Sequence, residues 1–388
     1  MATVYIHREL EKTIREAAEY FPVITVTGPR QSGKTTMLRQ LFPNLNYYSL
    51  ENPDVHDLAM RDPVRFLHQH DEGMILDEVH NAPQLLSYIQ GIVDERPDKR
   101  FILSGSSNFA LLRNVSQSLA GRSGVFELMP LSLSELTGGG NAEATADIDT
   151  LLYRGLYPAV ASKKNLPKFL YPSYVKTYLD RDVRSIVNVK DTMQFNTFLR
   201  LCAGRIGSVV NAMELANETG VSSKTIQAWL SVLTTSYVVF LLPPYYENTR
   251  KRLTKSPKLY FCDTGLACSL LGIESPEQLA RDKMRGHLFE NFVVTEFLKR
   301  RLNSGKEPNL CFYRDSNMNE VDLIVDNATS IEAYEVKSAM TYHPDFERTL
   351  RKLPEWINAP VSRRAVVYTG DVETTTGDIL LLNYRNMM

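Results

Sequence analysis

The sequence predicts an α/β protein that begins with a parallel sheet covered by helices on both faces. Apolar, strand-like runs alternate with helical patterns over residues 1–150, which is typical of such a sheet. A Gly-rich loop joins the first of these strands to the helix after it. A second, shorter α/β pattern occupies residues 281–388, which leaves residues 151–280 as a middle unit.

Length, charge and cysteine content limit the partners of the chain. Its 388 residues carry a formal net charge of −1, so any attraction to nucleic acid must come from a local basic patch. Its four cysteines are scattered, and we expect reduced core residues in a cytoplasmic protein. No apolar signal segment is seen near the N-terminus, and the apolar run at 237–242 is too short for a bilayer, so no membrane contact is expected.

The first strand, at residues 22–27, leads into a loop that matches the pattern G-x-x-x-x-G-K-[ST]. Its glycines let backbone N–H groups face an anion, and the next helix presents its N-terminus to the same phosphates. Lys34 would reach the β- and γ-phosphates of ATP, and Thr35 would bind Mg²⁺. An ordinary Gly-rich turn is the alternative. The expected nucleotide-binding residues are Gly28, Pro29, Arg30, Gln31, Ser32, Gly33, Lys34, Thr35 and Thr36.

A second apolar strand, at residues 73–78, ends in the carboxylates Asp77 and Glu78. After a phosphate-binding loop, this pattern predicts that Asp77 holds the Mg²⁺ shell. Glu78 would orient and polarise the water that attacks the γ-phosphate. A solvated turn is the alternative interpretation.

Two further polar residues are candidates for the same site. Ser106 follows the strand at residues 100–104, where it could touch the γ-phosphate or the attacking water, or simply close a turn. Arg122 could stabilise transition-state charge, in its own subunit or a neighbouring one, or could form a structural salt bridge. All these groups are expected at the carboxyl ends of parallel strands.

Four motifs together resemble a known family. They are G-P-R-Q-x-G-K-T-T, L-D-E, S-G-S-S and L-A-G-R followed by L-x-P-L-S. The set is similar to bacterial and archaeal AAA+ ATPases of the AAA_14 type with a C-terminal DUF4143 domain, over nearly the whole chain. The resemblance implies ATP binding and hydrolysis in an AAA+ core, and little about biological role.

The sequence of the middle unit predicts a winged helix. Residues 138–144 form a Gly-rich edge, and the helical run 169–186 resembles the linker of the same family, including a signature at 178–182 without a chemical role. Residues 212–230 read as a helix-turn-helix, with a turn at Gly220. Strand-like runs and a basic wing follow, at 238–243, 258–262 and 250–255. Such a unit could contact DNA phosphates through its wing or serve as an ATPase lid.

The C-terminal pattern resembles a restriction-endonuclease-like core. Glu290 lies on a helix, Asp322 on a strand, and Glu335 and Lys337 point to one face of the next strand. The resemblance implies that the three carboxylates hold Mg²⁺ and that Lys337 polarises the attacking water. The same fold could instead serve as a docking module.

The sequence supports two competing hypotheses for the function. In the first, ATP hydrolysis is coupled to a DNA-directed C-terminal module with nuclease chemistry. The basic wing and the Asp322, Glu335 and Lys337 set favour it. In the second, the protein is an ATP-driven switch whose C-terminal domains bind protein or nucleic acid without cleavage. The net charge near zero favours that alternative.

Overall fold

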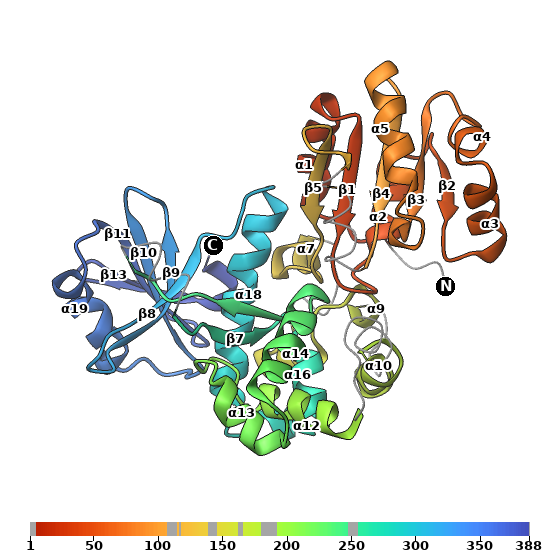
Figure 1. Cartoon of the computed structure of the whole chain (residues 1–388). Coiled ribbons are helices and arrows are strands. Elements are labelled where there is room, and N and C mark those ends of the chain that lie inside the picture. Colours follow the sequence, from red (N-terminus) through yellow and green to blue (C-terminus); the bar gives the residue numbers. More distant parts are fainter. Residues whose placement is uncertain are drawn as a thin grey trace.

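The computed structural model describes most of the chain (Figure 1). The Gly-rich edge after residue 138, the expected helical run after residue 179 and the basic wing up to residue 254 lie outside the described residues. Within the described part, every helix is too short or too polar to cross a membrane. The described residues are 5–106, 115, 118–138, 146–161, 166–179, 192–246 and 255–387.

The first unit contains a five-stranded sheet with the order β2-β3-β4-β1-β5, and every pairing is parallel. Strands β1 and β3 are buried along their whole length, as an internal position in a covered sheet requires. This confirms the predicted fold class. The strands are β1 (Val23–Thr27), β2 (Asn46–Ser49), β3 (Gly73–Asp77), β4 (Arg100–Ser104) and β5 (Ser123–Glu127).

Helices cover both faces of this sheet. Helices α1 and α2 pack on the face that contains Ile24 and Ile75, whereas α3, α4 and α5 pack on the face that contains Val23 and Leu76. Helix α3 ends before Pro63, which has no N–H to continue that helix and begins α4. The helices are α1 (Leu10–Tyr20), α2 (Lys34–Leu41), α3 (Pro53–Arg61), α4 (Pro63–Leu67), α5 (Leu85–Glu95) and α7 (Leu133–Gly138).

The middle unit is mainly helical and ends in a two-stranded antiparallel sheet, β6-β7. Gly220 ends α13 in a left-handed conformation, and the Ser222 side chain caps α14. Its elements are α8 (Ile148–Arg154), α9 (Pro158–Ala161), α10 (Pro167–Tyr174), α12 (Thr192–Ala203), α13 (Ala212–Thr219), α14 (Ser223–Thr235), β6 (Val239–Leu242), β7 (Lys258–Phe261), α16 (Thr264–Leu271) and α17 (Pro276–Leu279).

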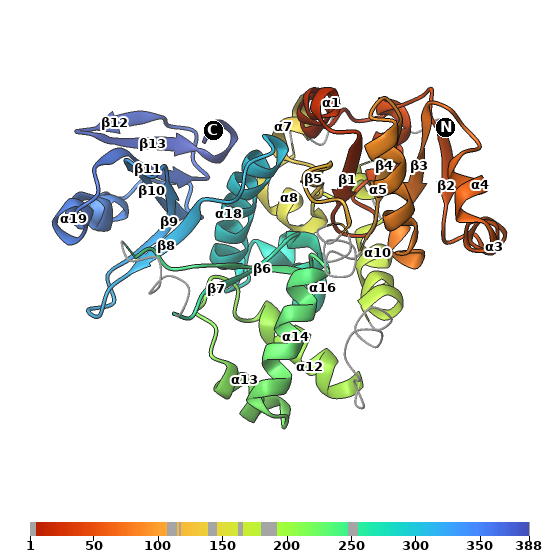
Figure 2. The same cartoon turned by 45° about the horizontal axis from the view of Figure 1, so that its top comes forward.

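The C-terminal unit is built on a mixed six-stranded sheet with the order β12-β13-β11-β10-β9-β8. Helix α18 packs on one face and α19 on the other. Figures 1 and 2 place α18 between this sheet and the rest of the molecule. The elements are α18 (Arg285–Asn303), β8 (Leu310–Arg314), β9 (Glu320–Asp326), β10 (Ile331–Lys337), α19 (Arg348–Trp356), β11 (Val361–Tyr368), β12 (Thr374–Thr376) and β13 (Ile379–Asn383).

A buried ion pair joins α18 to the segment after β5. Lys299 Nζ lies 2.7 Å from Glu296 Oε1 and donates to the carbonyl oxygen of Leu131 at 2.8 Å. The other oxygen of Glu296 accepts the backbone N–H of Leu133 at 2.7 Å. Both charged side chains are at most 3% exposed, so each depends on the other for compensation.

We expect Glu296→Ala to destabilise the protein strongly, because it leaves the buried Lys299 ammonium unpaired. The loss should be about 3–5 kcal/mol in the free energy of unfolding, followed by urea denaturation. The exposed Glu307, whose side chain lies in solvent near the end of α18, supplies the control Glu307→Ala. A loss below about 1 kcal/mol in Glu296→Ala would contradict this role.

Candidate functional site

Two glycines shape the loop that follows β1. Gly28 adopts a φ of 142°, and a Cβ atom there would lie 2.2 Å from the carbonyl oxygen of Leu128. Gly33 adopts a φ of 96° immediately before α2. Residues with a Cβ atom rarely adopt such positive φ angles, so both positions favour glycine. The loop therefore delivers the chain to a helix N-terminus, where backbone N–H groups can meet a phosphate.

Lys34 lies inside the loop. Its Nζ atom donates to the carbonyl oxygens of Gly28 and Pro29, at 2.9 and 2.8 Å, and the residue is 6% exposed. Burial lowers the pKa of Lys34 to about 8, against the opposing effect of the Glu78 and Asp77 carboxylates. An entering phosphate would replace the two carbonyl groups as the partner of this ammonium group.

Asp77 ends β3 and accepts hydrogen bonds from three hydroxyl groups. Those of Thr35 and Tyr47 each lie 2.8 Å from Oδ2, and Ser104 donates to Oδ1. Thr35 and Asp77, both expected at one Mg²⁺ ion, are thus in contact, and their oxygen atoms suit that hard cation. Tyr47 and Ser104 were not expected here. Ser104 has a signal in the sequence, since it is a polar residue at the carboxyl end of β4, whereas Tyr47 is the second residue of β2 and has none.

Glu78, the residue after Asp77, is held in place by hydrogen bonds from Ser106. It adopts a φ of 52°, and its Oε2 atom accepts the backbone N–H of Ser106 at 2.9 Å and the Ser106 hydroxyl at 3.2 Å. The ring of His80, which we had not expected here, lies 3.1 Å from the same oxygen. Burial alone would raise the pKa of Glu78, but His80, Lys34 and the Ser106 N–H outweigh it and lower the pKa to about 2.

Arg122 lies away from this group. It precedes β5, whose first residue pairs with Val23, whereas the loop follows the other end of β1. A five-residue strand puts roughly 15 Å between those edges. Arg122 instead binds Asp94 at 2.8 Å. The expected contact with a phosphate in its own subunit does not fit this position, and a role across a subunit interface stays a prediction.

Other residues support the loop from outside it. Arg8 donates to the carbonyl oxygen of Ser32 at 2.8 Å and pairs with Glu135 at 3.0 Å. Tyr237, between α14 and β6, has its hydroxyl 2.7 Å from that of Thr27, the last residue of β1. The sequence did not predict the contacts of Arg8 and Tyr237, because each contact joins segments that are far apart in the chain.

A second group of charged residues lies in the C-terminal unit. The Oδ2 atom of Asp322 accepts the N–H of Val336 at 2.8 Å and lies 3.7 Å from Lys337 Nζ, which is 2.6 Å from Glu335. Burial and the Asp322 carboxylate raise the pKa of both Glu335 and Glu290. The four residues that the sequence singled out are therefore close enough to influence one another.

These carboxylates do not form the expected Mg²⁺ site. Among the described residues, no three His, Cys, Asp or Glu side chains are placed to hold a metal ion. The reason is that lysines bind the carboxylates of Glu290 and Glu335, and one of them, Lys258, comes from β7 in the middle unit. Lys258 was not expected here, since the helices α16 and α17 separate it from α18 in the sequence.

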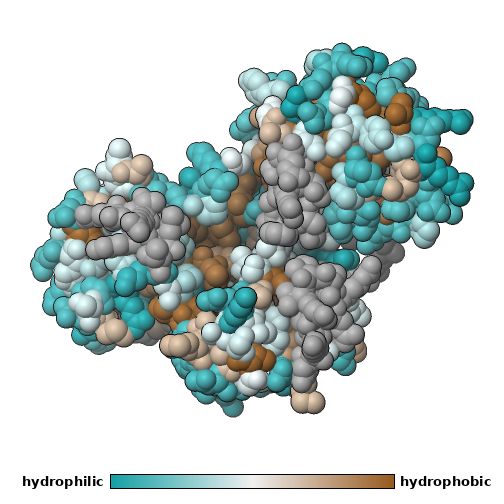
Figure 3. Space-filling view, in the orientation of Figure 1, coloured by the Kyte–Doolittle hydropathy of each residue, from teal (hydrophilic) through white to brown (hydrophobic). Residues whose placement is uncertain are grey.

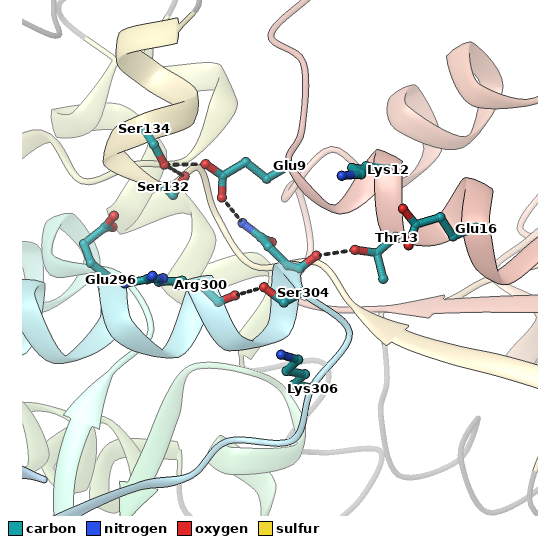
Figure 4. A pocket seen from close by; sticks show the side chains of 11 residues that line it. Glu9, Lys12, Thr13, Glu16, Ser132, Ser134, Glu296, Arg300, Ser304 and Lys306 are labelled. Atoms are coloured by element: carbon teal, nitrogen blue, oxygen red, sulfur yellow. Dashed lines mark hydrogen bonds between the residues drawn. The ribbon is translucent and has the colours of Figure 1, made fainter. Parts of the chain in front are cut away.

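A polar pocket of about 610 Å³ lies elsewhere, between α1, α7 and the end of α18 (Figure 4). Glu9 accepts hydrogen bonds there from Ser134 at 2.6 Å and Asn303 at 3.1 Å, and Thr13 donates to the Asn303 carbonyl at 2.7 Å. The view in Figure 3 shows apolar residues gathered in the hollow between the C-terminal unit and the rest of the molecule. The pocket and the apolar hollow both lie where units of the chain meet.

Comparison with known proteins finds three matching families and distant relatives. Residues 20–137 match an AAA domain, residues 145–277 a domain of unknown function (DUF8612), and residues 285–387 a domain of unknown function (DUF4143). The uncharacterized protein Rv2008c of Mycobacterium tuberculosis is 30% identical over 94% of this chain and 80% of its own length. The uncharacterized protein MJ1544 of Methanocaldococcus jannaschii is 24% identical over 77% and 71% of the two chains.

Solved structures are similar only in a general way. A Walker-type ATPase of Pyrococcus abyssi has a TM-score of 0.46 and 12% identity, over 68% of this chain and 94% of that one. A STAND protein with a tetratricopeptide repeat sensor, from Pyrococcus horikoshii, has a TM-score of 0.26 and 10% identity, over 78% of this chain and 48% of that one.

We expect ATP binding to weaken as the pH rises above about 8. The pKa of Lys34 is lowered to about 8 in the free protein, so the charged form that binds phosphate is lost above that value. The Kd for ATP should rise about fivefold between pH 8 and pH 9. Titration with a fluorescent ATP analogue at each pH measures it. Lys34→Met should bind weakly at every pH, and a flat wild-type profile up to pH 9.5 would contradict the assignment.

Proposed function

We propose that this chain, which belongs to the family of AAA-domain proteins with a C-terminal DUF4143 domain, binds ATP with Mg²⁺ and hydrolyses it. The observation that carries the proposal is the meeting of Lys34, Thr35, Asp77 and Glu78 at the carboxyl ends of β1 and β3. These groups come from two separate motifs, and the parallel register of the sheet brings them together.

Each side chain has a distinct part in this proposal. Lys34 exchanges the loop carbonyl groups for phosphate oxygens, and the backbone N–H groups at the start of α2 bind the same anion. Thr35 and Asp77 would hold Mg²⁺, which neutralises charge on the phosphates when it is bound. Glu78 is ionised at neutral pH, so it can accept a hydrogen bond from the attacking water.

Ser106 acts on Glu78 in this scheme. Its N–H and hydroxyl both donate to Oε2, so Oε1 is the oxygen that can accept a hydrogen bond from the attacking water. A contact between the Ser106 hydroxyl and the γ-phosphate, as first expected, would require that hydroxyl to leave Glu78.

We expect Glu78→Gln to keep ATP binding and to lower ATP turnover by about 10²–10⁴-fold, because the amide is a poor acceptor for the proton of the water. Phosphate release and binding of a fluorescent ATP analogue measure the two effects. The matched control is Glu72→Gln, an exposed carboxylate just before β3. Unchanged turnover in Glu78→Gln would remove that residue from the reaction.

For the C-terminal unit we propose a DNA-directed role, in which nuclease chemistry would require the carboxylates to leave the lysines that pair with them. Asp322 and Glu335 lie on paired strands, and Lys337 reaches both, which supports the proposal. We also propose that α13, α14 and the β6-β7 sheet form a winged helix that contacts DNA phosphates. The second candidate is an ATP-driven switch with non-catalytic docking domains, and the lysines bound to the carboxylates favour it.

We expect plasmid DNA to be cleaved in the presence of Mg²⁺ or Mn²⁺, and the cleavage to be lost in Asp322→Ala, because that change removes a central carboxylate. Gel assays with and without ATP, on plasmid and short duplex DNA, measure the reaction. Asp371→Ala, at an exposed carboxylate of the same unit, is the control. An absence of cleavage with either metal would favour the docking role.

A further inference from the structure

We propose that Arg30 binds the γ-phosphate of ATP in its own subunit and stabilises the charge that develops there during hydrolysis, and that Glu51 holds this side chain in the nucleotide-free protein. The inference rests on the proposed function and deepens it, since it assigns a catalytic cation to the same site. Arg122, the arginine expected to play this part, precedes β5 at the opposite edge of the sheet.

The place where Arg30 meets Glu51 carries the inference. The Nη1 atom of Arg30 lies 3.8 Å from Oε1 of Glu51. Arg30 follows β1 and Glu51 follows β2, and the sheet order puts β3 and β4 between these two strands. Neighbouring strands are about 4.8 Å apart, so β1 and β2 are separated by roughly 14 Å. The two side chains therefore meet across the carboxyl ends of β3 and β4.

These strand ends carry the residues that we expect to act on ATP. The chain after β2 stays beside the end of β3, because the Leu50 N–H donates to the carbonyl oxygen of Asp77 at 3.0 Å. Ser104, the last residue of β4, donates to the Asp77 carboxylate, which also accepts the Thr35 hydroxyl. The guanidinium group of Arg30 thus reaches across the strand ends at which the phosphate loop and Asp77 meet.

Arg30 and Lys34 bring two positive charges to the phosphate loop. Burial is the main cause of the lowered pKa of Lys34, and the nearby guanidinium group of Arg30 lowers that pKa further. The Arg30 side chain is only 16% exposed, so water screens its charge incompletely. Phosphate oxygens between the two cations would replace this repulsion by attraction.

Glu51 can release Arg30 at little cost. Their charged atoms are 3.8 Å apart, which is longer than a hydrogen bond, and the Glu51 side chain is 51% exposed. An exposed ion pair of this kind adds little to stability, because water screens the charges. A phosphate group, by contrast, can accept two parallel hydrogen bonds from a guanidinium group. We therefore expect bound ATP to take Arg30 from Glu51.

The charge that Arg30 would stabilise arises in one defined step. The oxygen of the attacking water forms a bond to the γ-phosphorus, the bond from that phosphorus to the bridging oxygen breaks, and ADP leaves with the electron pair. The proton that the water loses passes to Glu78 and then to solvent. Negative charge shifts toward the bridging oxygen, so a guanidinium group beside the γ-phosphate binds the transition state more tightly than ATP.

The alternative is that Arg30 and Glu51 form only a structural pair that shapes the loop. In that case, removing either charge breaks the same contact, and Arg30→Met and Glu51→Gln would have the same effect on ATP turnover. If Arg30 binds the γ-phosphate, the two changes differ, because Glu51 holds the guanidinium group only before ATP binds.

The test compares ATP turnover with formation of a transition-state complex in the full-length protein. Phosphate release measures turnover, and trapping of a fluorescent ADP analogue by aluminium fluoride, which takes the place of the γ-phosphate, measures the complex. We expect Arg30→Met to lower turnover about 10²–10³-fold and to abolish trapping, while the Kd for a fluorescent ATP analogue changes by less than about tenfold. Glu51→Gln should keep or raise turnover and should trap ADP as the wild type does.

Further variants separate this effect from the loss of any arginine or from a folding defect. Arg96→Met removes an arginine that pairs with exposed Asp98 near the amino end of β4, and it should leave turnover and trapping unchanged. Arg30→Lys keeps the charge without the planar fork, so turnover should fall about tenfold while analogue binding stays unchanged. Wild-type turnover in both Arg30 variants, or an equal loss in Glu51→Gln, would overturn the inference.

A failure of the proposed ATPase would give a different result. A wild-type protein that neither binds the ATP analogue nor releases phosphate would overturn the ATPase, and the part of Arg30 with it. Turnover that is lost in Glu78→Gln and is unchanged in Arg30→Met would keep the ATPase and overturn only the part of Arg30.

Discussion

The rest of the structure depends on buried charges around the short segment that follows β5. Lys299 and Glu296 bind this segment from α18. Arg8, which pairs with Glu135 of α7, binds it from the N-terminal side through the Met129 carbonyl oxygen. The charged groups are nearly inaccessible to water, so each must stay paired or pay a large desolvation cost. These buried pairs therefore hold α18 in a fixed position relative to the first sheet.

The middle unit connects the two candidate sites. The β6-β7 sheet reaches Thr27 beside the loop through Tyr237, and it reaches Glu290 through Lys258. Tyr237 lies just before β6, so one short part of the middle unit contacts both groups of residues.

The two sites share a physical principle. Each of them contains a buried lysine held by oxygen atoms, with Lys34 on loop carbonyl groups and Lys258 on carboxylates. At the loop, phosphate binding would be an exchange of partners, because the Lys34 ammonium group already has two. At the C-terminal unit, Lys258 of β7 pairs with Glu290 and Glu320 and so joins two units of the chain.

The sequence by itself determined the parallel sheet, the loop and the Asp77–Glu78 pair, because short-range spacing and strand periodicity encode them. It also indicated Glu290, Asp322, Glu335 and Lys337. Only the tertiary structure decided their partners. Arg122 lies at the opposite edge of the sheet from the loop, and Lys258 pairs with Glu290, since contacts between distant segments depend on packing and leave no local pattern.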